Sequence, residues 1–157
     1  MSSGVTAQEV VAAYVARGST AATAESLTAG LVAASLADVP GASSMLRGGV
    51  VSYATEVKAA LLGVSADLLK EAGSVDPEVA RQMAVGARAA CGADYAVSTT
   101  GAAGPEPHDG KPVGTVFVGL AGPGGTEVRE YRFSGTRAEI RAAARDAALT
   151  ALLDAVS

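Results

Sequence analysis

The sequence predicts an α/β fold in three layers (α/β/α), in which a mixed central sheet lies between two layers of helices. Helix and strand patterns alternate in the early part of the chain, which is typical of parallel strands joined by helices. Two strand patterns around Pro123-Gly124-Gly125 then predict an antiparallel hairpin. A last helical pattern follows the hairpin, so helices are expected on both faces of the sheet.

Capping residues and glycines set the expected boundaries in the first half of the chain. Thr6 with Glu9 resembles a capping box that opens a helix, and Gly18 ends it. Thr55 is expected to cap a short helix that ends at Gly63. Between and after these helices we expect a strand over 20–24, a helix over 28–37, a strand over 48–53 and a further helical turn over 65–70.

Similar signals divide the second half. Asp76 caps a helix that has Pro77 at its first position and runs to about residue 90. Thr136 with Glu139 forms a second capping box, which opens the final helix toward Leu152. The remaining segments are a strand over 94–99, a Gly- and Pro-rich loop over 101–112 and the hairpin strands over 113–120 and 126–133.

Composition narrows the classes of function. The 157 residues fit one domain, 1–157, and the net charge of −4 without a run of Lys or Arg argues against nucleic acid as a partner. No apolar run suits a membrane span, no signal peptide is visible, and the single Cys91 excludes an internal disulfide, so a soluble cytoplasmic protein is expected. With one His and no metal-ligand spacing, neither a metal nor another cofactor is expected.

Arginines gather late in the chain, where acidic residues dilute them. We interpret that region as a solvated helix face rather than as a site for a polyanion. The arginines are Arg129, Arg132, Arg137, Arg141 and Arg145, and the acidic residues are Glu127, Glu130, Glu139 and Asp146.

The segment from Glu25 to Gly30 lies at the expected junction between a strand and the helix that follows it. Free N–H groups at a helix start bind phosphate or carboxylate well. Taken alone, however, Ser26 or Thr28 at this position is more often only a helix cap.

Tyr53 and Lys58 stand at the next strand-to-helix junction. A cation in the first turn of a helix is disfavoured by the helix dipole, and burial would favour the neutral amine further, so Lys58 is a candidate base. The alternative is a surface lysine paired with Glu56 or Asp67.

Two loops complete the candidate site. Ser43 lies in a Pro-Gly-Ala-Ser-Ser turn, where serine is usually only a turn former. The segment from Thr100 to Pro105 follows a strand, and glycine loops at strand ends are typical ligand sites. The polar residues 106–111 after it could form a lid, in which His108 is expected to be exposed.

Six segments together resemble the C-terminal domain of the competence/damage-inducible protein CinA, a domain that also occurs alone as nicotinamide-nucleotide amidohydrolase. The resemblance covers residues 5–152, nearly the whole chain. The segments are Thr23-Ala-Glu-Ser-Leu-Thr-Ala-Gly, Val39-Pro-Gly-Ala-Ser-Ser, Arg47-Gly-Gly-Val-Val-Ser-Tyr, Lys58 with Leu61-Leu-Gly-Val, Gly101-Ala-Ala-Gly-Pro and Lys111-Pro-Val-Gly-Thr-Val.

The resemblance implies metal-free hydrolysis of the carboxamide of nicotinamide mononucleotide, giving nicotinate mononucleotide and ammonia. The family's functional positions fall on Ser26, Ser43, Tyr53 and Lys58. A small-molecule mononucleotide is then the partner, and a homodimer would fit the family. Residues expected to shape the substrate pocket are Glu25, Thr28, Gly30, Thr100, Gly101, Ala102 and Gly104.

The chain departs from the family pattern at two places. Leu27 and Ala29 stand where the family usually has Cys and Gly, and Ala29 would be strained if its φ is positive. Glu106-Pro107-His108-Asp109 replaces a glycine-rich loop, which bears on substrate preference.

The residue types support a serine hydrolase mechanism in which neutral Lys58 takes the proton of a serine directly or through Tyr53. Ser43, nearer Tyr53 along the chain, is slightly favoured over Ser26 as the nucleophile, with Ser26 orienting the substrate amide. Backbone N–H groups of the Ser26–Gly30 turn or of the Gly101 loop would hold the oxyanion. The substrate phosphate would lie at a helix N-terminus or against one of the late arginines. Two alternatives remain: a non-catalytic nucleotide-binding or interaction module, and a serine amidase for another carboxamide.

Overall fold

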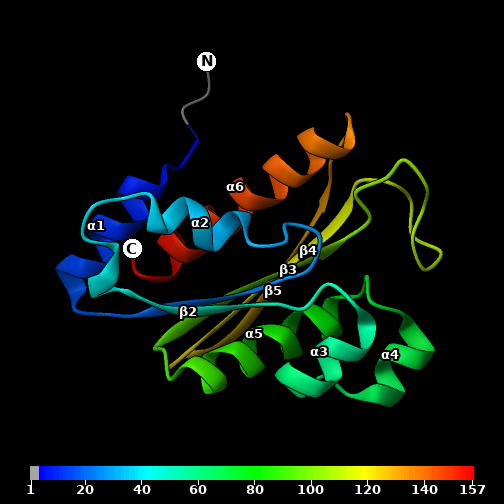
Figure 1. Ribbon diagram of the computed structural model, residues 1–157, viewed down its shortest axis with the longest axis horizontal. Coiled ribbons are helices and arrows are strands. Elements are labelled where there is room, and N and C mark those ends of the chain that lie inside the picture. Colours follow the sequence, from blue (N-terminus) through cyan, green and yellow to red (C-terminus); the bar gives the residue numbers. More distant parts are fainter. Residues whose placement is uncertain (1–3) are drawn as a thin grey trace.

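The computed structural model describes residues 4–157 and contains one five-stranded sheet between two helical layers (Figure 1). The strands are β1 (Ala21–Glu25), β2 (Leu46–Val51), β3 (Tyr95–Gly101), β4 (Thr115–Gly122) and β5 (Gly125–Arg132), in the spatial order β2-β1-β3-β4-β5. β1 runs parallel to β2 and β3, whereas β3 with β4 and β4 with β5 are antiparallel. The predicted mixed sheet and late hairpin are confirmed.

Three helices cover each face of the sheet (Figure 1). One layer consists of α1 (Ala7–Arg17), α2 (Leu31–Ala37) and α6 (Arg137–Ala155), with α6 packed on β3 and β4. The other consists of α3 (Thr55–Leu62), α4 (Ala66–Ala72) and α5 (Pro77–Cys91), with α5 packed across the strands. Small buried side chains from both layers, many of them alanines, let the helices approach the sheet closely.

The predicted caps form at most helix ends. The Thr6 hydroxyl accepts from Glu9 N, and Gly18 ends α1 in the left-handed conformation. At the start of α6, Thr136 and Glu139 make the reciprocal capping box. At α3 the prediction was wrong by one residue: Ala54 is the N-cap and Thr55 is the first helical residue.

The start of α2 differs most from the prediction. Ala29 and Gly30 have φ values of 48° and 102°, which an α-helix cannot contain, so α2 begins at Leu31 rather than at Thr28. Residues 26–30 therefore form a turn between β1 and α2, and Ala29 occupies the strained conformation considered above.

The carboxyl ends of β1, β2 and β3 meet at one end of the sheet, because these three strands are parallel. In Figure 1 this is the right-hand end, from which the yellow-green loop between β3 and β4 projects. In α/β sheets this end is the usual place for a ligand. Separately, no helix within residues 4–157 combines the length and apolar character needed to cross a bilayer.

Candidate active site

A buried serine–lysine pair lies at this end of the sheet. Lys58 Nζ is 2.9 Å from Ser26 Oγ, and it also donates to the backbone oxygens of Ser52 (2.7 Å) and Tyr53 (3.2 Å). The Lys58 side chain is completely buried, with 0% exposure, and Ser26 is buried as well. The alternative of a surface lysine paired with Glu56 or Asp67 is therefore wrong.

The surroundings of Lys58 shift its protonation equilibrium toward the neutral amine, the form that can accept a proton. A neutral amine has two N–H groups, which the two backbone carbonyls can accept, and one lone pair, which is left facing the Ser26 hydroxyl. Burial lowers the pKa of Lys58 to about 8, although the carboxylates of Asp109 and Glu56 act in the opposite direction. At neutral pH a minor fraction of the amine is thus unprotonated, a larger one than for a lysine in water.

Glu25 builds the turn that carries Ser26. Its buried carboxylate accepts from the Thr28 hydroxyl (2.7 Å) and from the N–H groups of Gly30 (3.1 Å), Val32 (2.9 Å) and Ala33 (3.0 Å). The chain's own carboxylate thus occupies the N-terminus of α2, where a substrate anion was expected. The contacts of Glu25, Thr28 and Gly30 are therefore structural, in place of the predicted substrate contacts.

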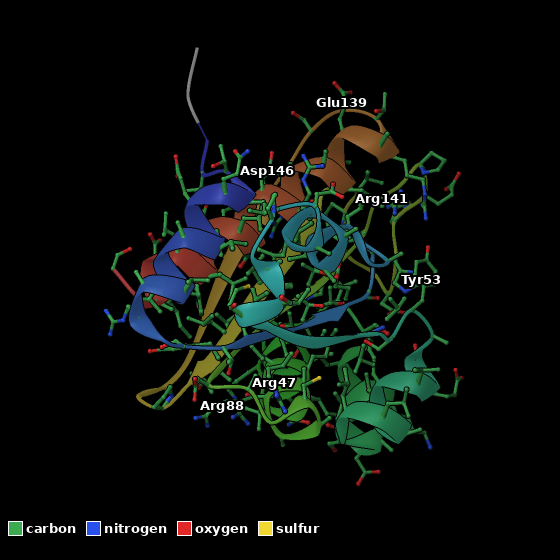
Figure 2. The ribbon with its side chains drawn as sticks, turned by 60° about the vertical axis from the view of Figure 1, so that its left-hand side comes forward. Arg47, Tyr53, Arg88, Glu139, Arg141 and Asp146 are labelled. Carbon is green, nitrogen blue, oxygen red and sulfur yellow. The ribbon has the colours of Figure 1, made fainter. Side chains whose placement is uncertain are left out.

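Arg141 of α6 also braces this turn. It donates to the backbone oxygens of Leu27 (2.8 Å) and Thr28 (3.2 Å). In Figure 2 Arg141 extends from α6 on the same side of the molecule as Tyr53. Glu25 from β1 and Arg141 from α6 together hold the turn that follows Ser26.

A cavity of about 270 Å³ opens beside Ser26. This is near the lower end of the roughly 300–1,000 Å³ that is usual for small-molecule sites. Its lining comes from the turn after β1, the end of β2, the loop after β3 and the start of α6, and comprises Ser26, Leu27, Tyr53, residues 101–108 and Arg137. Gly101, Ala102 and Gly104 thus lie where the sequence predicted, whereas Thr100 is buried behind them and donates to Ser74 O (2.7 Å).

Tyr53 contributes in two different ways. Its backbone oxygen accepts from Lys58, but its hydroxyl accepts from Arg137 (2.8 Å) at the cavity wall. Within residues 4–157, no hydrogen bond joins the Tyr53 hydroxyl to Lys58 or to either serine. The geometry therefore supports direct proton transfer from Ser26 to Lys58 rather than the relay through Tyr53.

Ser43 lies at the other end of the sheet. It is exposed in a short 3₁₀ helix, η1 (Ala42–Ser44), that precedes the amino end of β2, whereas Ser52, Tyr53 and Lys58 follow its carboxyl end. A six-residue strand is about 20 Å long. Figure 2 labels Arg47 near the start of β2 and Tyr53 just beyond its end, well apart in that view. The structure does not bring Ser43 to the amine, which corrects the preference for Ser43 over Ser26.

The interpretation of the late arginines needs a partial correction. Arg129, Arg132 and Arg145 pair with acidic neighbours, as a solvated face would. Arg137 instead lines the cavity and donates to Gly104 O and Tyr53 OH, and Arg141 braces the Ser26 turn. Sequence reasoning offered a late arginine for the substrate phosphate without saying which one, and it missed the role of Arg141. The available signal was their position: both are cations near the start of a helix, where the dipole disfavours them unless they have specific partners.

Fold and site together define an α/β domain with a buried serine–lysine pair at the carboxyl ends of parallel strands. The chain belongs to the CinA C-terminal domain family, whose model matches residues 4–156. The resemblance inferred from its motifs is thereby confirmed.

Related proteins agree in sequence and in structure. The chain is 54% identical over 132 residues to a CinA-like protein of Frankia casuarinae, covering 84% of this chain and 30% of the relative. It is 48% identical over 132 residues to a putative competence-damage inducible protein of Desulforamulus reducens, covering 84% of this chain and 32% of the relative. The chain thus spans about a third of the length of these curated relatives.

Solved structures match over nearly the full length of both chains. A CinA superfamily protein from Klebsiella pneumoniae superimposes with a TM-score of 0.92 at 34% identity, covering 96% of this chain and 94% of that chain. The competence/damage inducible protein CihA from Agrobacterium tumefaciens gives a TM-score of 0.90 at 34% identity, with 98% of each chain covered.

Proposed function

We propose that this domain hydrolyses the carboxamide of nicotinamide mononucleotide to nicotinate mononucleotide and ammonia, with Ser26 as nucleophile and Lys58 as base. The observation that carries the proposal is the 2.9 Å contact between Ser26 Oγ and Lys58 Nζ, whose other contacts are two backbone carbonyls. Serine with a neutral lysine can cleave an amide without imidazole or metal. Membership in the CinA family, with the motifs described above, supports the choice of substrate.

Acylation begins with proton transfer. Lys58 takes the proton of Ser26 as its oxygen attacks the carboxamide carbon, and a tetrahedral intermediate forms. The Lys58 ammonium then returns that proton to the departing nitrogen, which leaves as ammonia, and an ester remains on Ser26. Water attacks the ester with Lys58 again as base; the proton returns to Ser26 and nicotinate mononucleotide is released.

Backbone N–H groups beside Ser26 are suited to the developing oxyanion. Among the described residues, the N–H groups of Leu27 and Thr28 make no hydrogen bond, whereas those of Ser26 and Ala29 are used within the fold. Arg141 and Glu25 hold the flanking backbone, so these donors would need no rearrangement during the reaction.

Arg137 is suited to the substrate phosphate. It is the only Lys or Arg in the cavity lining given by the described residues, and it is anchored by Gly104 O and Tyr53 OH at the rim. A planar guanidinium recognises phosphate well. Of the two places that the sequence left open for the phosphate, a helix N-terminus or a late arginine, we favour the arginine, because Glu25 occupies the N-terminus of α2.

The test is ammonia release from nicotinamide mononucleotide, nicotinamide riboside and unrelated carboxamides. The wild-type domain is expected to prefer the mononucleotide, since the riboside lacks the phosphate. Lys58→Ala should lose on the order of a thousandfold or more in kcat. Tight mononucleotide binding without ammonia would indicate a binding module, and faster release from another carboxamide would indicate a different amidase.

A further inference from the structure

The loop between β3 and β4 contains a tight turn at Asp109 and Gly110. Their φ values are 48° and 75°, and the backbones of His108 and Lys111 exchange two hydrogen bonds of 3.1 and 2.9 Å across the turn. Asp-Gly is a preferred pair where both central residues need positive φ. The residues just before the turn, 105–108, form one wall of the cavity beside Ser26.

The Asp109 side chain fastens this loop to the segment between α4 and α5. Its Oδ2 accepts from the backbone N–H of Ser74 at 2.8 Å and lies 3.3 Å from His108 Nε2. Ser74 is buried with 4% exposure, so the bond from its N–H is shielded from water on the Ser74 side.

Ser74 is in turn bonded to two of the elements that build the site, α3 and β3. Its hydroxyl bonds Thr55 Oγ1 at 2.8 Å, at the start of the helix that holds Lys58. Its carbonyl accepts from Thr100 Oγ1 at 2.7 Å, next to the cavity residue Gly101. A bond to Ser74 therefore fixes the loop relative to the lysine and to the floor of the cavity.

Close packing at Gly73 supports the same contact. A Cβ added at Gly73 would lie 2.7 Å from Asp109 Cβ and 2.9 Å from Asp109 Oδ2. Any side chain at this position would push Asp109 away, so the approach of the loop depends on glycine there.

We propose that Asp109 is a positioning residue that latches residues 105–111 onto Ser74, so that the outer wall of the cavity is formed before substrate arrives. The role in catalysis rests on the proposed function; the latch itself does not. Removing the latch should loosen the wall and weaken substrate binding, while the Ser26–Lys58 contact stays in place.

Asp109 also contributes charge near the base. Burial lowers the pKa of Lys58, and the carboxylates of Asp109 and then Glu56 raise it in part. The other charged or titratable groups at the cavity are Glu106, His108, Arg137 and the hydroxyl of Tyr53. Asp109 therefore has two separable effects, one on the position of the loop and one on the proton affinity of the amine.

Asp109→Asn and Asp109→Ala separate these effects. Asparagine keeps an oxygen that can accept from Ser74 N–H and tolerates positive φ, but it has no charge, whereas alanine loses the bond as well. Glu56→Gln is the matched control, because it removes a carboxylate near Lys58 from an exposed position outside the loop.

Two measurements need no substrate and so do not depend on the amidase. The pKa of Lys58 is followed by NMR of ¹³C-labelled lysine, which is practical because Lys58, Lys70 and Lys111 are the only lysines. Amide hydrogen exchange at Ser74 and across 105–111 reports the latch. KM and kcat for the mononucleotide form the third measurement.

Asp109→Asn is expected to lower the pKa of Lys58 below its wild-type value while exchange at Ser74 stays slow and KM stays within about threefold. Asp109→Ala should speed exchange at Ser74 and in the loop tenfold or more and raise KM about tenfold, with a smaller change in kcat. Glu56→Gln should leave exchange unchanged. If Asp109→Ala shows the same amide exchange rates and the same KM as the wild type, the proposed role of Asp109 as a latch is wrong. Inactivity of the wild type with fast exchange in Asp109→Ala would instead refute only the proposed substrate.

Discussion

Two serine-bearing turns lie at opposite ends of the sheet and differ in what surrounds their serines. Ser26 follows the carboxyl end of β1, where Glu25 and Arg141 hold its turn and Lys58 meets its hydroxyl. Ser43 precedes the amino end of β2 and is exposed, in a turn whose hydrogen bonds are made by backbone groups. The comparison teaches that strand direction, rather than distance along the chain, decides which serine reaches the amine.

The largest effect expected from this contrast is on catalysis. Ser26→Ala should lower kcat for ammonia release on the order of a thousandfold or more, because it removes the proposed nucleophile. Ser43→Ala is the matched control and should stay within about twofold of wild type. Equal losses in the two variants, measured on folded protein, would contradict the assignment of the nucleophile to Ser26.

The next effect is on stability and concerns the support of each turn. Glu25→Ala leaves the N–H groups of Gly30, Val32 and Ala33 without their acceptor and should cost roughly 3–5 kcal/mol of unfolding free energy. Ser44→Ala, at an exposed position in the other turn, should change it by less than about 0.5 kcal/mol. Urea unfolding of both variants compares the two turns. A small loss of unfolding free energy in Glu25→Ala would show that the Glu25 carboxylate does not stabilise its turn.

A third difference between the two ends is the buried lysine, which makes stability depend on pH. Burial lowers the pKa of Lys58 from 10.5 to about 8, so the folded state binds fewer protons than the unfolded state between these values. The free energy of unfolding of the wild type therefore rises with pH across this window. Lys58→Met lacks this contribution, because it has no amine to titrate at this position. Relative to that of Lys58→Met, the free energy of unfolding of the wild type should therefore rise by on the order of 3 kcal/mol between pH 7 and pH 10.5.

Denaturant unfolding at pH 7, 9 and 10.5 measures this change. Lys70→Met is the control, because it removes a lysine from an exposed position outside the candidate site. A constant difference between Lys58→Met and wild type would mean that the amine is protonated as readily in the fold as in water.

The smallest effect concerns the backbone of the Ser26 turn. Ala29 has a φ of 48°, so Ala29→Gly should relieve strain and raise the free energy of unfolding by about 0.5–1 kcal/mol. Ala34→Gly, in regular helix on the exposed side of α2, should instead lower it by about 1 kcal/mol. Thermal unfolding distinguishes the two signs, and a loss in both variants would argue against strain at Ala29.

Much of the fold was predictable because its signals are local. Capping pairs such as Thr136 with Glu139 and the Pro123-Gly124 turn act over a few residues, so their outcome is visible in the sequence. Where the predicted start of a helix was wrong, contacts made in the folded structure set the boundary instead. Thr28 looked like a helix cap, but its hydroxyl bonds Glu25 and Thr99, and the helix begins after the turn.

The candidate site was predictable in part for the same reason. Lys58 stood out because a cation in the first turn of a helix opposes the dipole, and Ser26 stood out because it follows a strand. Arg137 and Arg141 did not, because their partners, Tyr53 and Leu27, are far away along the chain. Glu25 looked available to a substrate, since only the folded turn shows that its carboxylate is already used.

By itself, the sequence determined the order of helices and strands, the mixed sheet and the presence of a lysine suited to act as a base, because propensities, caps and dipoles act locally. Only the tertiary structure decided which serine meets that lysine, which arginine faces the cavity and where the β3–β4 loop is fastened. Those contacts join residues far apart in the chain, and they exist because parallel strands bring their carboxyl ends to the same end of the sheet.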